Sequence, residues 1–162
     1  MERELPLEFD IAVRSRIAIA APARTVWQWI EKPATWNPTI AGIERLAGEA
    51  GQVGETLRVM QRRGDQLVAT ILRTLSVEPA AWRVQSLETE ASRAAQGYVL
   101  YSLQEDGAGT IVSGELVAHC VYPATATGEF SWETFAEQAS AATRRKLDDD
   151  HARLKALVEQ NL

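Results

Sequence analysis

The longest regular pattern of hydrophobic positions lies at the C-terminal end of the chain. Between residues 130 and 162, apolar or small side chains recur at steps of three and four residues, which is the spacing of one helix face. These positions are Trp132, Phe135, Ala136, Ala139, Thr143, Leu147, Leu154 and Val158. No glycine or proline interrupts the run, so the pattern predicts one amphipathic helix over residues 130–162. A helix of roughly 30 residues is about 45 Å long, enough to cross a small domain.

The apolar stripe of this helix changes in character along its length. Its second half is bulky, with Leu147, Leu154 and Val158. Its first half carries small side chains after Trp132 and Phe135. These small residues are Ala136, Ala139, Ser140 and Thr143. Small side chains between a helix and a sheet leave a gap. Either bulky side chains of the sheet fill this gap, or it stays open as a cavity. The sequence alone leaves both alternatives open.

Most of the remaining chain has the alternating pattern of β-strands. We predict strands at residues 11–20, 43–46, 55–61, 66–77, 82–87, 96–104 and 110–122. Short segments rich in glycine, proline or acidic residues separate the last six strands, for example Arg63-Gly64-Asp65. Consecutive strands joined by short turns predict an antiparallel meander.

Two short helices are predicted between the first and the second strand. Pro22 suits the first position of a helix, and Val26 and Ile30 then lie one turn apart in a helix over residues 23–30. Pro33 ends this helix, and residues 36–38 open a second short turn or helix. The expected fold is therefore α+β, with a strongly curved seven-stranded antiparallel sheet wrapped around the long C-terminal helix.

Composition and charge exclude several classes of function. With 162 residues, 46% apolar, the chain is expected to form a single domain over residues 1–162. A net charge of -5 without a stripe of lysine and arginine argues against a nucleic-acid partner. The single Cys120 cannot form an internal disulfide, and no apolar run approaches the ~20 residues that span a bilayer. The first residues also lack the apolar core of a signal peptide, so we expect a cytoplasmic protein.

Four segments, in this order, carry a family resemblance. They are IAIAAPARTVWQWIEKPATWNP (17–38), GQVGETLRV (51–59), VLYSLQEDGAGTIVSGEL (99–116) and LDDDHARLKALVE (147–159). On these residues the chain resembles the START-like, helix-grip (SRPBCC) superfamily, in its polyketide cyclase/dehydrase and lipid-transport branch. The resemblance implies a hydrophobic cavity between the sheet and the long helix. It implies no particular chemistry, because this fold hosts carriers, sensors, cyclases and chaperone cofactors.

Strand alternation, the helix face and the resemblance together suggest which residues line that cavity. Trp36 resembles the family tryptophan near the cavity mouth, and Trp132 stands at the small-residue end of the long helix. The candidate set is Trp36, Val59, Tyr101, Val112, Leu116, Trp132, Phe135, Ala136, Ala139, Ser140 and Thr143. For the tryptophans and Tyr101, packing in a filled core is the alternative interpretation.

No catalytic residue can be assigned from the sequence. By alternation Glu115 and His119 face outward, and His151 is expected to be a partly buried packing residue of the long helix. Arg58 and Arg83 come closest to an inward ionisable group, but each lies between the more apolar positions of its strand. The charged run over residues 144–150 indicates a solvated helix face. Neither the spacing of the histidines and cysteine nor any motif indicates a metal site, and we expect no cofactor.

Three classes of function are compatible with these observations. The first is binding or carrying of a small hydrophobic, lipid- or polyketide-like molecule in the cavity, with Tyr101, Ser140 or Thr143 fixing its orientation. The second is an aromatase/cyclase- or dehydrase-type enzyme in the same cavity, which would need an inward ionisable side chain. The third is a protein-interaction module, which would need a sizeable exposed apolar patch. The identity of the ligand and a homodimer formed through edge strands both stay open.

Overall fold

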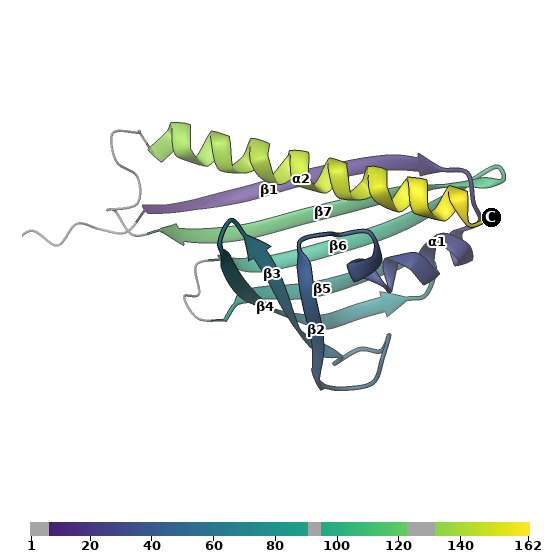
Figure 1. Cartoon of the computed structure of the whole chain (residues 1–162), viewed down its shortest axis with the longest axis horizontal. Coiled ribbons are helices and arrows are strands. Elements are labelled where there is room, and N and C mark those ends of the chain that lie inside the picture. The colour runs from purple at the N-terminus through teal and green to yellow at the C-terminus, as the bar shows by residue number, and fades with distance from the viewer. Residues whose placement is uncertain (1–6, 91–94, 123–131) are drawn as a thin grey trace, which may run out of the picture.

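The structure, a computed structural model, describes residues 7–90, 95–122 and 132–162, which form one antiparallel sheet and three helical segments (Figure 1). The strands are β1 (Leu7–Ile19), β2 (Ile40–Ala47), β3 (Thr56–Arg63), β4 (Gln66–Glu78), β5 (Trp82–Thr89), β6 (Ala95–Asp106) and β7 (Gly109–Tyr122). The helical segments are α1 (Ala23–Ile30), the 3₁₀ turn η1 (Pro33–Thr35) and α2 (Trp132–Gln160).

The sheet has the strand order β1-β7-β6-β5-β4-β3-β2, and every neighbouring pair is antiparallel. Strands β2 to β7 form a meander, and β1 joins it beside β7. In Figure 1, α2 runs along β1, and β2 to β4 turn across the direction of β1 and β7. This curvature around α2 and the element order confirm the predicted helix-grip architecture.

The second short helical segment differs from the prediction. It is the 3₁₀ turn Pro33–Thr35, which lies before the expected position at residues 36–38. The N–H of the first residue in a helical turn has no partner within the turn, so a proline, which lacks this N–H, is tolerated there. Pro33 therefore begins the turn that follows α1. Trp36 then caps the turn, and its indole N–H donates a 2.8 Å hydrogen bond to the carbonyl oxygen of Trp29.

Strand pairing determines which side chains share the face that α2 covers. In antiparallel strands, directly opposed residues project to the same side of the sheet. One such row runs across six strands through Leu57, Leu72, Leu87, Gly97, Ala118 and Ile11. Ile11 and Ala118 are buried, and the three leucines are half-buried. The inward face predicted for β7 is also confirmed. Val112 and Cys120, which were predicted to face inward, are buried, and His119, which was predicted to face outward, is exposed.

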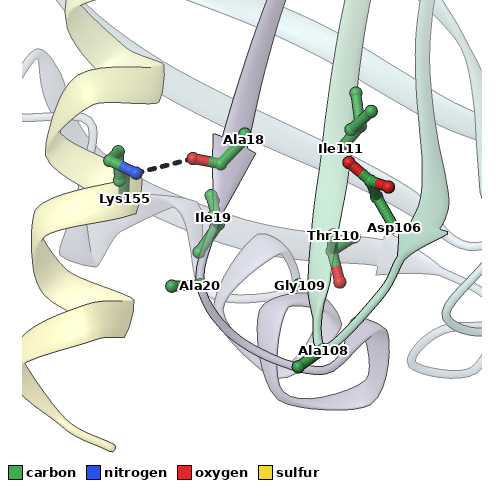
Figure 2. A pocket seen from close by; sticks show the side chains of 9 residues that line it. All are labelled: Ala18, Ile19, Ala20, Asp106, Ala108, Gly109, Thr110, Ile111 and Lys155. Atoms are coloured by element: carbon green, nitrogen blue, oxygen red, sulfur yellow. Dashed lines mark hydrogen bonds between the residues drawn. The ribbon is translucent and has the colours of Figure 1, made fainter.

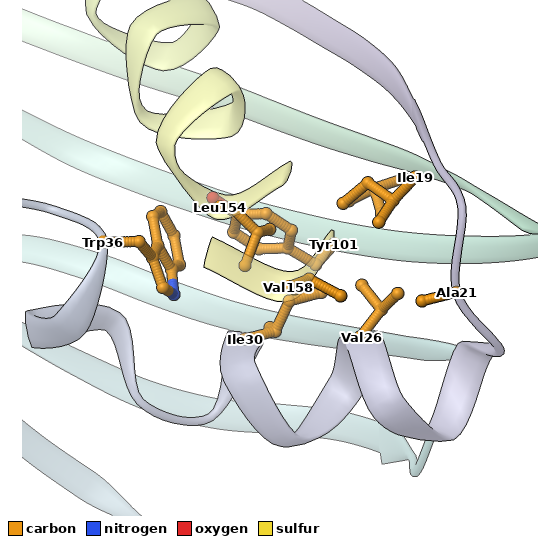
Figure 3. Close-up of a cluster of buried hydrophobic side chains, with 9 residues drawn as sticks. Ile19, Ala21, Val26, Ile30, Trp36, Tyr101, Leu154 and Val158 are labelled. Carbon is orange, nitrogen blue, oxygen red and sulfur yellow. The ribbon is translucent and has the colours of Figure 1, made fainter. Parts of the chain in front are cut away.

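Two apolar clusters hold α2 and α1 against this face. The α1 cluster contains buried side chains from β1, α1, the η1 segment, β6, β7 and the second half of α2 (Figure 3). Its members are Ile19, Ala21, Val26, Ile30, Trp36, Tyr101, Val112, Leu154 and Val158. The β1 cluster has Phe9, Ile11, Val13, Ala118 and Cys120 at its centre. Leu87, Ala95, Leu116, Phe135, Ala136, Ala139 and Leu147 pack against that centre.

Candidate functional site

The small-residue half of α2 packs on bulky side chains of β1. Phe135 meets Phe9 edge to face, with ring centroids 5.6 Å apart, and Ala136 and Ala139 pack against the same β1 cluster. On this side the sheet therefore fills the gap that the small helix residues leave. Ser140 and Thr143 are half-buried, and the Thr143 hydroxyl donates to the carbonyl oxygen of Ala139 at 2.8 Å.

The candidate cavity residues divide between the two clusters. Trp36, Tyr101 and Val112 meet in the α1 cluster, where the rings of Trp36 and Tyr101 are 6.4 Å apart (Figure 3). Leu116 belongs with Phe135 and the alanines in the β1 cluster. Val59 is buried on β3, opposite Thr70 of β4. Trp132 begins α2, but its side chain lies outside the described part of the structure.

A polar row crosses the covered face next to these residues. Ser15 of β1 is paired with Gly114 of β7, Gly114 with Tyr101 of β6, and Tyr101 with Arg83 of β5. Because directly opposed residues share a face, all four project toward α2. The row brings a hydroxyl group, a phenol and a guanidinium group to one level of the sheet.

His151 of α2 lies directly above this row. It is 0% exposed, and its ring centroid is 5.7 Å from that of Tyr101. Among the described residues, neither ring nitrogen of His151 has a hydrogen-bond partner. Burial lowers the pKa of His151 to about 4, and the charges of Asp150 and Asp148 only partly oppose this shift. His151 is therefore neutral at physiological pH, and it is more deeply buried than the sequence indicated.

Arg83 is the second ionisable group on the covered face. Its Nε atom is buried and has no hydrogen-bond partner in the part of the chain that the structure describes. Its guanidinium carbon lies 5.9 Å from the centre of the Trp27 ring. Burial lowers the pKa of Arg83, while the nearby Tyr101, Glu31 and Glu55 act in the opposite direction. Burial likewise raises the pKa of Tyr101 well above its usual range, so its hydroxyl keeps its proton.

The sequence interpretation of β5 was wrong about Arg83. Alternation suggested that the apolar neighbours of Arg83 would face inward, but β5 turns Arg83, Gln85 and Thr89 toward α2 and leaves Trp82 43% exposed. This orientation is stabilised within the sheet, since the buried Gln85 side chain donates to Thr74 of β4 at 3.3 Å.

The other arginine considered, Arg58, has a different environment. Its Nε donates a 2.6 Å hydrogen bond to Glu90, and both side chains are well exposed. Glu115 and His119 face outward as predicted. Glu115 pairs with Arg14 at 3.2 Å, and the exposed His119 bonds to Asp10, which raises the pKa of His119.

The charged run of α2 also differs from the prediction at one position. Asp150 is only 4% exposed, whereas a fully solvated helix face was expected. It accepts hydrogen bonds from Lys146 at 2.6 Å and Arg153 at 3.1 Å, and Lys146 also reaches the side-chain oxygen of Asn37 at 3.4 Å. The segment after η1 therefore covers this side of α2.

A small hollow of about 290 Å³ lies at the end of the sheet, outside the polar row (Figure 2). It is bounded by Ala18 to Ala20, the β6–β7 hairpin and Lys155, whose ammonium group donates to the carbonyl oxygen of Ala18 at 2.6 Å. None of the candidate cavity residues lines this hollow. Because it lacks their aromatic surface, the hollow is a poorer candidate for a ligand site than the covered face of the sheet.

Metal-binding groups and membrane-crossing helices are two further features that bear on the class of site. In residues 7–90, 95–122 and 132–162, no group of three or more histidine, cysteine, aspartate or glutamate side chains is arranged to hold a metal ion. Over the same residues, no helix combines the length and the apolar character that crossing a membrane requires.

Solved structures with the same fold cover nearly the whole chain. The Zhui aromatase/cyclase from Streptomyces sp. R1128 is 17% identical, with a TM-score of 0.70 over 94% of this chain and 95% of that one. A START superfamily protein from Mycobacterium smegmatis is 18% identical, with a TM-score of 0.70 over 93% of this chain and 99% of that one. Ara h 8.0201 is 11% identical, with a TM-score of 0.67 over 94% and 99% of the two chains. At these identities the likeness shows the fold alone.

The sequence itself matches one family. No curated protein matches it at a significant level. Residues 10–159 match the family model described as "Polyketide cyclase / dehydrase and lipid transport", which covers more than half of the chain. This match confirms the resemblance seen in the four sequence segments, and the chain belongs to the polyketide cyclase/dehydrase and lipid transport family.

Proposed function

We propose that this protein binds a small hydrophobic, lipid- or polyketide-like molecule between α2 and the covered face of the sheet. One observation carries the proposal. Leu57 and Leu72 lie in the same cross-strand row as the buried Ile11 and Ala118, yet they are only half-buried and belong to neither apolar cluster. Apolar side chains on the inward face of the sheet that keep accessible surface offer contact area to an apolar ligand.

Three further features support this location. The family description includes lipid transport, and neither apolar cluster that the residues of α2 join includes a residue of β3 or β4. Trp36 and Tyr101 offer rigid aromatic surface beside the polar row. Ser140 and Thr143 are half-buried on α2 and offer hydroxyl groups. The full candidate set, including Trp132, stays a set of proposed ligand contacts, in which Leu116, Phe135, Ala136 and Ala139 mark the border where α2 packs on the β1 cluster.

A pair of matched tryptophan variants tests the proposal. Leu72→Trp adds bulk on the covered face, and Leu75→Trp adds the same bulk at a 44% exposed position of the same strand. Titration with the neutral dye Nile red should show saturable binding to the wild type and Leu75→Trp. Leu72→Trp should weaken this binding roughly tenfold, because it occupies the contact area. Absence of saturable binding, or equal binding by both variants, would overturn the proposal.

An enzyme of the aromatase/cyclase or dehydrase type is the second candidate, and one observation favours it. Among the described residues, the two ring nitrogens of His151 and the Nε atom of Arg83 are buried without hydrogen-bond partners on the face where the ligand is proposed to bind. Perturbed ionisable groups of this kind gather at catalytic sites. The test is the product distribution that the protein gives from a reactive poly-β-ketone chain, measured by liquid chromatography and mass spectrometry. An enzyme should shift this distribution away from the spontaneous products, and His151→Leu should abolish the shift.

The remaining expectations from the sequence are also proposals. We propose that the chain acts as one domain in the cytoplasm, where a buried free thiol such as Cys120 stays reduced. A homodimer would form through β2, the edge strand opposite β1, where Ile43 and Leu46 are exposed. Light scattering coupled to size-exclusion chromatography distinguishes this dimer from a monomer.

A further inference from the structure

We propose that Arg83, Tyr101 and His151 form a subsite for an anionic oxygen, so that the ligand is an amphipathic molecule ending in a carboxylate or similar oxyanion. This inference rests on the proposed function, because it concerns the polar end of the same ligand. Its starting point is the polar row, where Arg83 and Tyr101 are directly paired under His151.

The strongest element of this subsite is the guanidinium group of Arg83. No carboxylate of the described residues lies within 4.0 Å of it, and its Nε is buried without a partner. The two carboxylates whose charges raise the pKa of Arg83 are those of Glu31 and Glu55, and both bind other partners. Glu31 accepts a 3.0 Å hydrogen bond from the indole N–H of Trp27, and Glu55 accepts a 3.1 Å hydrogen bond from Nε of Arg45. A half-buried cation that has no salt-bridge partner is costly where its nitrogen is desolvated, and a ligand oxyanion would remove this cost.

Tyr101 and His151 add neutral donors to the same level. The Tyr101 hydroxyl keeps its proton, because burial raises its pKa. A neutral imidazole carries one N–H, and both His151 ring nitrogens are available for it. Of the charged groups near His151 on its own helix, Asp150 is already held by Lys146 and Arg153, and Asp148 is exposed.

The balance of donors and acceptors determines the chemical class of the ligand. Arginine offers only donors, tyrosine offers a donor, and neutral histidine offers one donor and one acceptor. Such a site favours a carboxylate, enolate or phenolate oxygen over an alcohol and disfavours an amine. The aromatic surfaces of Trp27 and Trp36 beside it exclude water and strengthen the charge-assisted hydrogen bonds.

Three ligands with the same alkyl chain separate the polar subsite from the apolar one. Decanoate, decan-1-ol and decylamine are titrated against the protein loaded with Nile red, at pH 7. We expect decanoate to displace the dye at roughly tenfold lower concentration than decan-1-ol, since a hydrogen bond to a charged group contributes more than a neutral one. Decylamine should bind most weakly. Equal potency of decanoate and decan-1-ol on the wild type would overturn the inference, whatever the variants do.

Variants then assign the preference to Arg83. Arg83→Met keeps an unbranched apolar side chain but removes the guanidinium group and its charge. It should reduce the preference for decanoate to within about threefold while leaving the binding of decan-1-ol unchanged. Arg58→Met, at an exposed arginine, is the matched control and should keep the preference. A preference that survives Arg83→Met would also overturn the inference. If no ligand displaces the dye and the dye itself does not bind, the proposed function fails, an outcome distinct from binding without head-group preference.

Discussion

The imidazole ring of His151 on α2 occupies the space that a side chain at Gly114 of β7 would need. A Cβ atom at Gly114 would lie 2.7 Å from Cε1 and 2.8 Å from Nε2 of His151, closer than real Cβ atoms approach their neighbours. The backbone of Gly114 needs no left-handed conformation, so glycine is required here by packing and not by its φ angle. The histidine ring fills the position of the missing side chain and fixes how closely α2 approaches the sheet at the polar row.

Gly114→Ala should therefore destabilise the protein. The added methyl group forces the His151 ring out of its position, and overpacking of this kind costs about 1–3 kcal/mol. Urea unfolding at pH 7 measures the loss. Gly42→Ala is the control, because nothing lies within 4 Å of a Cβ at that glycine of β2. A Gly114→Ala variant as stable as Gly42→Ala would show that the helix moves away freely.

His151 should make stability fall with decreasing pH in a defined window. Its pKa is about 4 in the folded protein and near 6.5 in the unfolded chain. Between these values the unfolded chain binds a proton that the folded protein does not, so acidification favours unfolding. The full difference is about 3 kcal/mol and is reached as pH approaches 4. Tyr101 from the sheet, and Asp148 and Asp150 from α2, are titratable groups that lie near it.

The measurement compares wild type with His151→Leu in urea unfolding at several pH values between 4 and 7. For each protein, the free energy of unfolding at pH 4 is subtracted from that at pH 7, which cancels the change in packing. This pH-dependent loss of stability should be about 3 kcal/mol smaller for His151→Leu than for the wild type. His151→Gln serves as a second variant, in case leucine does not fit above Gly114. Parallel pH profiles for wild type and both variants would contradict the lowered pKa.

The overall fold was predictable because it rests on repeated patterns. The apolar stripe over residues 130–162 gave α2, and alternation over residues 110–122 placed Val112 and Cys120 inward and His119 outward. Such patterns sum many weak preferences, so a single exceptional residue does not change them. Segment boundaries depend on one or two residues and were less accurate, as Pro33 shows by beginning η1.

The polar half of the site could not be predicted in this way. On β5 the inward face carries the polar Arg83, Gln85 and Thr89 beside Leu87, and the apolar Trp82 faces outward. A rule that places apolar side chains inward therefore assigns the wrong face to Arg83. The environment of His151 depends on strands far away in the sequence. One signal was available, since a glycine on the inward face of a strand, here Gly114, often marks the close approach of another group.

Overpacking the first half of α2 distinguishes a filled gap from an open one. Ala139 packs against the β1 cluster, so Ala139→Leu should cost about 1–3 kcal/mol by crowding Phe9 and its neighbours. Ala142→Leu, at an exposed position of the same helix, should change stability by less than about 0.5 kcal/mol. If Ala139→Leu is as stable as the wild type or more stable, there is unoccupied space beside β1, and the ligand site extends to that strand.

The buried carboxylate of Asp150 should contribute more to stability than its exposed neighbours. It joins Lys146 and Arg153, and through Lys146 it connects α2 to Asn37 after η1. Asp150→Asn removes the charge that these hydrogen bonds use, at a predicted cost of about 1.5–3 kcal/mol, because both cations remain able to reach solvent. Asp149→Asn, one residue earlier and exposed, should cost less than about 0.5 kcal/mol.

Salt dependence separates the two environments further. Buried ion pairs are screened much less than exposed ones, so the cost of Asp150→Asn in thermal or urea unfolding should persist at 1 M salt, where the Debye length is about 3 Å. Equal effects of Asp149→Asn and Asp150→Asn, or loss of the Asp150→Asn effect in salt, would mean that this side of α2 is solvated. In that case the segment after η1 does not close over the helix, and the covered face would be open beside Trp36.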